Sequence, residues 1–207
     1  KKFFVIRTLD GGKTWQDISE INKPVADSGE ACFAASGTNV RALDNDEAVF
    51  VSGGLSSNIF IRDQKNKLPI VQGQETTGAN SIAVWDRYKR KGGDQLVVVG
   101  GDFQQPDNDS LNCFYSGNRG KTWKSPKTPP HGYRSCVEYL DKETLVSCGL
   151  NGVDYSIDNA NTWKWISKES FNVCRIAKIG RTVYLAGNNG KVAKLDYQFD
   201  DRRKKLN

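Results

Sequence analysis

An eight-residue pattern occurs three times in this chain and restricts its possible folds more than any other feature. The copies, TLDGGKTW at 8–15, SGNRGKTW at 116–123 and SIDNANTW at 156–163, each begin with a hydroxyl residue and end with Thr-Trp. Their third position is Asp or Asn, whose side chain accepts hydrogen bonds from backbone N–H groups of a tight turn. We call this pattern the box. It assigns structural roles to Asp10, Gly12, Trp15, Asn118, Gly120, Trp123, Asp158 and Trp163.

Two of the boxes depart from the shared pattern. Asn118 keeps the hydrogen-bond acceptor of an Asp without its charge. Ala160 stands where the other boxes have Gly, and because Gly tolerates positive φ, we expect a distorted turn in the third box. Each box ends on a large aromatic ring that can pack against a sheet. We therefore expect Trp15, Trp123 and Trp163 to be mostly buried, at equivalent positions of three repeats.

The spacing of the boxes gives the size of the repeat. Trp123 and Trp163 lie 40 positions apart, which is about the length of a four-stranded propeller blade. Trp15 and Trp123 lie 108 positions apart, which leaves room for two blades. One blade must therefore lack a recognisable box.

Short segments rich in β-branched residues recur in groups of three and predict the strands of each blade. We expect inner strands at 31–36, 80–85, 135–140 and 172–176, second strands at 48–53, 95–100, 144–149 and 182–187, and third strands at 58–62, 111–116, 152–156 and 191–195. The segment 3–8 reads as a third strand, because a box follows it.

These patterns predict an all-β fold, a β-propeller of four-stranded antiparallel blades. The propeller occupies 1–196, starts in the middle of a blade and covers about four and a half blades. We expect seven blades in the full ring, with five as the alternative. The basic segment 197–207 is expected to be a solvated tail.

Composition narrows the functional classes. The chain is 37% hydrophobic and 26% charged, as in folded domains, and has no apolar run of the roughly 18 residues that a membrane span needs. The net charge of +6 is spread along the chain without the Arg and aromatic spacing of nucleic-acid modules, so we expect no nucleic-acid partner. Five cysteines form no CxxC pair and His131 is the only histidine, so we expect no metal and no cofactor. Cys32, Cys136 and Cys174 are expected to be reduced and to lie on inner strands.

The loops that lead into the inner strands are polar and should converge at one mouth of the central channel. We expect Arg134 and Arg175 to form a clamp for a carboxylate or phosphate. The alternative is that each arginine pairs with an acid such as Glu138 or Glu169 and only braces the ring. The full set of candidate ligand-binding residues is Glu30, Asn80, Tyr133, Arg134, Asn172 and Arg175.

The boxes resemble the Asp boxes of sialidases and other bacterial propellers. With segments such as ACFAASGTN at 31–39 and GYRSC at 132–136, the chain resembles propellers related to the photosystem II assembly and stability factor, in the form found in non-photosynthetic bacteria. The resemblance implies a non-catalytic binding or assembly role, with an unknown protein or an anionic or carbohydrate ligand as partner. It also implies export to the periplasm or the outside.

A hydrolase of sialidase type is the alternative function. Tyr133 beside Arg134 fits it, with Glu30 or Glu75 as helper, but the Phe/Tyr-Arg-Ile-Pro segment of sialidases is absent and catalytic residues stay unknown. Paired carboxylates about 5–9 Å apart at the channel mouth would favour it. An oxidoreductase has no support, because the chain has no dinucleotide-binding glycine motif.

Overall fold

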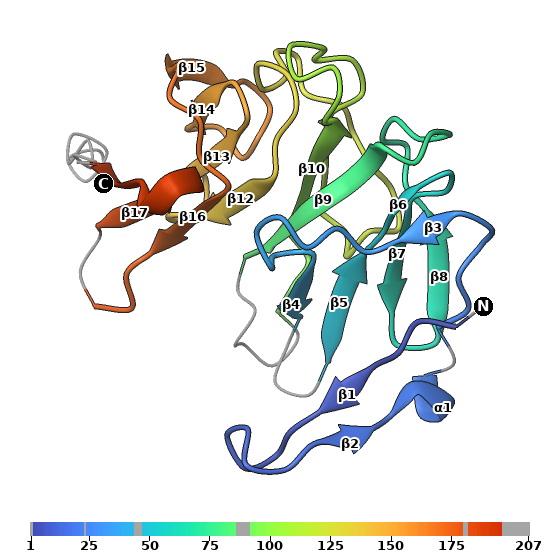
Figure 1. The fold of residues 1–207 in the computed structure, drawn as a ribbon. Helices are drawn as coiled ribbons and strands as arrows, with labels where there is room; N and C mark the ends of the chain where they lie inside the picture. Colours follow the sequence, from blue (N-terminus) through green and yellow to red (C-terminus); the bar gives the residue numbers. More distant parts are fainter. Residues whose placement is uncertain (1, 23, 44–46, 86–91, 180–181, 196–207) are drawn as a thin grey trace, which may run out of the picture.

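Short antiparallel sheets, placed side by side in an open arc, make up most of the chain (Figure 1). The structure is a computed structural model and describes residues 2–22, 24–43, 47–85, 92–179 and 182–195. The predicted tail 197–207 lies outside these residues. The all-β prediction is confirmed, and in the described part of the chain no helix has the length and apolar character to cross a membrane.

Four of the sheets correspond to blades. The first contains β4 (Val40–Ala42), β5 (Ala48–Val51), β7 (Asn58–Ile61) and β8 (Gln64–Lys67). The second contains β9 (Thr77–Val84), β10 (Leu96–Asp102) and β11 (Cys113–Ser116), and β6 (Gly53–Gly54) and β3 (Glu30–Ala31) extend it beyond β9. The third contains β12 (Cys136–Tyr139), β13 (Leu145–Gly149), β14 (Gly152–Ser156) and β15 (Lys164–Ser167), and the fourth β16 (Val173–Ile176), β17 (Val183–Ala186) and β18 (Val192–Leu195).

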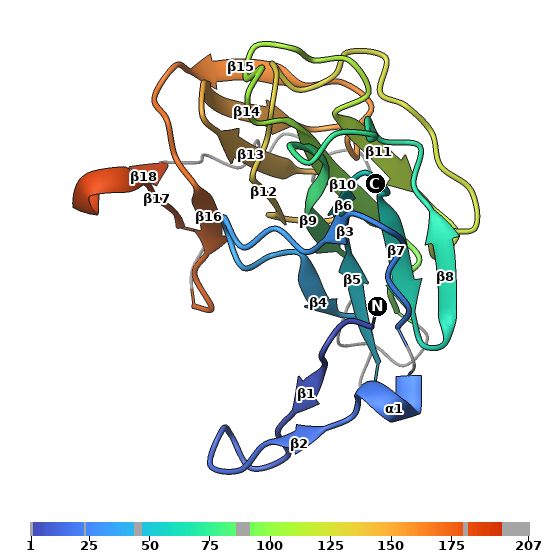
Figure 2. The ribbon, with the colours of Figure 1, turned by 45° about the vertical axis from the view of Figure 1, so that its right-hand side comes forward.

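The remaining elements are small. A hairpin of β1 (Ile6–Arg7) and β2 (Gln16–Asp17) carries the first box, and α1 (Ser19–Asn22) follows it. A 3-10 turn, η1 (Asn188–Gly190), joins β17 to β18. In Figures 1 and 2 the hairpin lies apart from the four sheets. Phe3 connects this end of the chain to the first sheet through ring contacts with Phe50 and Phe60.

The innermost strands β4, β9, β12 and β16 contact one another in that order around the arc. For the second, third and fourth sheets the predicted inner strands are confirmed. For the first sheet the prediction of 31–36 is wrong, because β4 takes that place. The segment 31–36 leaves Cys32, Ala34 and Ala35 exposed, whereas β4 leads directly into the fully buried Leu43.

Alternation along β9 and β10 explains how the sheets pack. Leu96 and Val98 face the first sheet, whereas Val97 and Val99 face the third. Successive strand residues point to opposite faces, so the second sheet buries both of its faces. A further apolar cluster joins the third and fourth sheets, with Val146 and Leu185 among its members.

The hydrogen bonds of the boxes confirm the predicted turn. In every box the Asp or Asn side chain accepts from the N–H of the Thr four positions later, at 2.8–2.9 Å. The first hydroxyl accepts from the N–H of the small fifth residue. The distortion expected at Ala160 is wrong, because this alanine adopts φ 68° and keeps the same hydrogen bond.

The three box tryptophans differ in burial. Trp163 is only 5% exposed, and Trp123 packs half-buried against the core between the first two sheets. Trp15 is 57% exposed, so the prediction of burial is wrong at this position. Its hairpin pairs with no further strand of the described chain, and therefore no sheet lies behind the ring.

Candidate functional site

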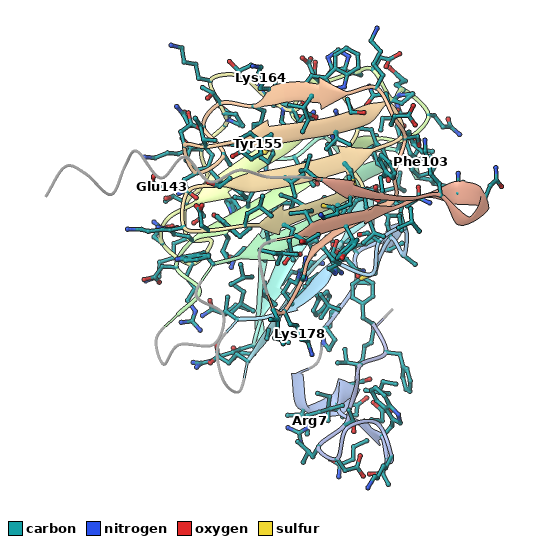
Figure 3. The ribbon with its side chains drawn as sticks, turned by 90° about the vertical axis from the view of Figure 1, so that its left-hand side faces the viewer. Arg7, Phe103, Glu143, Tyr155, Lys164 and Lys178 are labelled. Carbon is teal, nitrogen blue, oxygen red and sulfur yellow. The ribbon has the colours of Figure 1, made fainter. Side chains whose placement is uncertain are left out.

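The two ends of the blades carry different sets of loops. Loops between neighbouring blades and between second and third strands lie at one end, which we call the entry face. Loops between first and second strands, together with the boxes, lie at the other end, which we call the box face. In Figure 3, Phe103 on the entry face and Glu143 on the box face lie at opposite sides of the sheets.

Glu30 lies on the entry face but inside the protein. Its side chain accepts hydrogen bonds from Asn58 at 2.8 Å and from Ser52, and it forms an ion pair with Lys65 at 2.9 Å. Lys65 also pairs with Asp27 at 2.7 Å. This hydrogen bond with Lys65 is the main reason that the pKa of Asp27 falls to about 2. Lys65 therefore binds both carboxylates, and the Glu30 side chain is fully buried and not open to a ligand.

Asn80 and Tyr133 contact each other across two blades. The Tyr133 hydroxyl donates to Asn80 Oδ1 at 2.8 Å, and both residues are buried. Burial raises the pKa of the Tyr133 phenol, so this group remains protonated and is not an activated nucleophile. Gly132 sets its position, because a side chain there would collide with the Pro106 carbonyl and the backbone has φ 80°.

Arg134 is fully buried and engaged within the protein. It forms an ion pair with Asp154, donates to the Tyr133 carbonyl at 2.7 Å and donates to Asn151. Asp154 and Asn151 therefore occupy the guanidinium donors that a bound ligand would use. The predicted clamp of Arg134 with Arg175 is wrong, and Arg134 instead braces the third blade.

Arg175 lies on the innermost strand of the fourth blade and remains 40% exposed. Its NH1 group lies 3.3 Å from Glu138 Oε2 and 3.2 Å from the Cys174 carbonyl. The same Glu138 oxygen accepts from Arg41 NH2 at 2.6 Å. Three inner strands, β4, β12 and β16, thus place two arginines on one carboxylate. Asn172 precedes β16 and binds Asn188 at 2.8 Å.

The sequence reasoning missed Arg41. Arg41 lies between Val40 and Ala42 in β4, a segment outside the predicted inner strands, so it was not assigned to the channel. The sequence does contain a pattern that links it to the other two residues, because the segments that carry Arg41, Glu138 and Arg175 each have a charged residue at mid-strand. These three residues align only when β4, and not 31–36, is taken as the inner strand of the first blade.

The predicted positions of the cysteines are confirmed for two residues and wrong for the third. Cys136 and Cys174 lie on inner strands, as expected, and the structure places their Sγ atoms 3.6 Å apart. Cys32 follows β3 instead, so its predicted place on an inner strand is wrong. That the thiols stay reduced remains a prediction. The described residues contain no group of three or more His, Cys, Asp or Glu arranged to hold a metal ion.

The side-by-side sheets, their shared inner strands and the boxes define the chain as part of a β-propeller. No protein-family model and no curated protein matches it. Among solved structures it is similar to Ycf48 bound to D1 peptide, with a TM-score of 0.50 and 12% identity over 81% of this chain and 54% of that one. It is also similar to an ancestral GH74 enzyme, with a TM-score of 0.51 and 14% identity over 87% of this chain and 24% of that one.

At these identities the likeness establishes the fold alone. The chain spans about half the length of the Ycf48 chain and about a quarter of the GH74 chain. The two structures have different functional descriptions, so the fold does not choose between binding and hydrolysis. The choice depends on the side chains of this chain.

Proposed function

We propose that this chain is part of a non-catalytic binding propeller, which holds an anionic group of a protein partner at the channel through Arg175. One observation carries the proposal: every hydrogen bond of Arg175 to the described residues uses NH1. Its Nε and NH2 donors therefore remain available on a side chain that is 40% exposed. An arginine with two parallel donors is well suited to bind a carboxylate.

The surrounding charges support this role. Arg41 and Arg175 share Glu138, so the group carries one excess positive charge. Glu138 is buried and fixes the direction of both guanidinium groups before a ligand arrives. Preorganised donors lose less conformational entropy on binding. The Ycf48 structure contains a bound peptide, and we extend peptide binding to this chain as part of the proposal. Export, expected from the sequence, also belongs to it.

Peptide titration tests the proposal. Fluorescence-labelled acidic peptides with a free C-terminal carboxylate are titrated with the protein, beside amidated peptides of the same sequence. We expect Arg175→Gln to weaken binding of the free-acid peptides by about tenfold or more. Lys178→Gln is the matched control, because this cation lies just beyond the same strand and is exposed.

Two outcomes of the titration would contradict the proposal. Equal binding of free-acid and amidated peptides, or equal binding by both variants, would contradict a carboxylate site at Arg175. The same preparations are assayed with aryl glycosides, including a sialoside. Turnover that survives in Arg175→Gln and exceeds the buffer rate would establish the hydrolase alternative instead.

A further inference from the structure

A cavity lies on the box face among the outer strands, apart from the inner strands β4, β12 and β16 that carry the proposed peptide site. Its volume is about 290 Å³, and it lies between the β7–β8 turn of the first blade and the second box. Two neighbouring blades therefore build it together. Its lining residues are Glu47, Ile61, Arg62, Gln64, Asn66, Arg119, Gly120 and Lys121.

Cations dominate the lining of the cavity in the described part of the chain. There, three of them, Arg62, Arg119 and Lys121, stand beside the carboxylate of Glu47. Glu47 is 10% exposed, and each of its oxygens faces one arginine: Oε1 pairs with Arg62 and Oε2 lies 2.7 Å from Arg119 NH2. This largely buried carboxylate thereby draws two guanidinium groups from different blades to one place, and Lys121 adds a further cation.

The arginines and the lysine retain access to solvent. The Arg62 side chain is 69% exposed although it is paired with Glu47, and Lys121 is exposed. Gln64 and Asn66 stand at alternate positions of β8, so they point to the same side of this strand and add amide donors to the wall. Lys121 also lines an adjoining shallow hollow over Trp123, so it can be approached from two sides.

Sequence differences between the boxes restrict this arrangement to the second one. At the fourth and sixth box positions the second box has Arg119 and Lys121. The first box has Gly11 and Lys13 there, and the third has two asparagines. The turn geometry needs neither cation, because all three boxes form the same hydrogen bonds without the side chains at these positions.

We propose that this cavity binds a small dianion, a phosphate monoester or a dicarboxylate. Guanidinium groups bind both kinds of anion through paired N–H donors, and the exposed Arg62 and Lys121 offer a dianion one cation from each blade. The volume lies near the lower limit of small-ligand sites, which run from about 300 Å³ upward, and this favours a compact ligand. Bound dianion competes with Glu47 for Arg62, the more exposed of the two arginines.

Nuclear magnetic resonance titration of the whole chain tests the site. Glycerol 2-phosphate, malonate and inorganic phosphate are added separately at low ionic strength, and the Gly120 amide reports on the cavity. We expect saturable shifts with at least one of the two organic dianions. Tighter binding of glycerol 2-phosphate would identify a phosphate ester as the ligand, and tighter binding of malonate a dicarboxylate.

Three variants separate the site from general attraction to a basic protein. Arg62→Gln and Lys121→Gln should each weaken binding by about tenfold or more. Lys13→Gln removes the equivalent cation of the first box and should leave the affinity unchanged. Both cavity substitutions replace exposed side chains, and the melting temperature of each variant checks that it folds. The proposal would be overturned if neither organic dianion gave saturable shifts, or if all three variants bound with equal affinity.

Discussion

Trp163 and Trp15 occupy the same position of the same motif and yet have different surroundings. The Trp163 ring packs among Ala83, Val137 and Leu145 of two sheets, and its indole N–H donates to the Ala160 carbonyl at 3.2 Å. Trp15 is 57% exposed, and its hairpin pairs with no further strand in the described part of the chain. Burial at this motif is therefore a property of the sheet behind it.

This difference predicts unequal costs of truncation. Trp163→Ala should lower the free energy of unfolding by roughly 3–5 kcal/mol, because it empties a filled core position. Trp15→Ala should cost about 1 kcal/mol or less, since the ring is already in water. Urea unfolding followed by circular dichroism measures both values. Similar costs for the two variants would show that the exposed ring has a structural role.

Arg134 gives a second residue-scale prediction, because its partner is also buried. Arg134→Ala leaves Asp154 without its counter-ion in the interior and should cost about 3–5 kcal/mol. The double variant Arg134→Met with Asp154→Leu removes both charges and should recover most of that loss. Urea unfolding of Arg134→Met, of Asp154→Leu and of the double variant gives the coupling. A double variant that is less stable than Arg134→Ala would refute the bracing role.

At the scale of elements, the box works as a hydrogen-bonded turn whose chemistry tolerates Asp or Asn. Thr14 and Thr162 donate from Oγ1 to an Asp carboxylate, whereas Asn118 donates from Nδ2 to Thr122 Oγ1 at 2.9 Å. The Thr hydroxyl is thus a donor in the two Asp boxes and an acceptor in the Asn box, and the backbone hydrogen bonds of the turn are the same in all three. Ala160 shows the same tolerance, because the buried turn holds it at positive φ.

In the second box, where the parent residue is the uncharged Asn118, exchange for Asp should therefore be nearly neutral. Asn118→Asp should change the free energy of unfolding by about 0.5 kcal/mol or less, because Thr122 can donate instead of accept. Asn118→Ala should cost about 1–2 kcal/mol, since the N–H of Thr122 loses its acceptor. Thermal unfolding compares the two. A large loss in Asn118→Asp would mean that the charge itself is excluded from the second box.

The charge of Asp158 predicts a dependence on pH. Burial raises its pKa, but hydrogen bonds from Thr162 and Ser156 outweigh burial and hold the pKa below the ordinary 3.8. A lowered pKa stabilises the folded state above pH 3.8, and this contribution disappears as pH falls through the folded-state pKa. Asp158→Asn should thus be less stable than the parent at pH 7, with the difference shrinking below pH 3.8. Unfolding in urea at several pH values measures it, and a constant difference would contradict the assignment.

At the scale of the whole molecule, the arc has a protected centre and exposed ends. The second sheet is covered on both faces, by the first and third sheets. At one end β18 exposes Val192, and at the other the β1–β2 hairpin exposes Phe4 and Leu9. Stability should follow this order, because backbone hydrogen bonds open most easily where few apolar contacts cover them.

Hydrogen exchange tests the order directly. Amides of β9 and β10 should exchange slowest, at the rate of global unfolding, and those of β1 and β2 fastest. Mass spectrometry of peptic fragments resolves these segments. The fourth sheet should fall between them, since only one of its faces is packed. Protection of β1–β2 equal to that of β10 would indicate that a partner covers the hairpin.

Local sequence patterns were enough to predict the all-β class, the box turns and most of the strands. These features depend on residues close together in the chain: the box closes its own hydrogen bonds within eight residues, and alternation along a strand is a local pattern. For the same reason the blade spacing could be read from Trp123 and Trp163 alone.

Long-range packing, in contrast, sets which polar side chains face water and which of them pair with each other. Arg134 precedes β12 and is enclosed with Asp154, whereas Arg175 lies within β16 and remains partly exposed. The cavity at Arg62 and Lys121 likewise exists only because two blades meet there. Burial and ion pairing depend on neighbours that are distant in the chain, and local sequence carries no record of those distances.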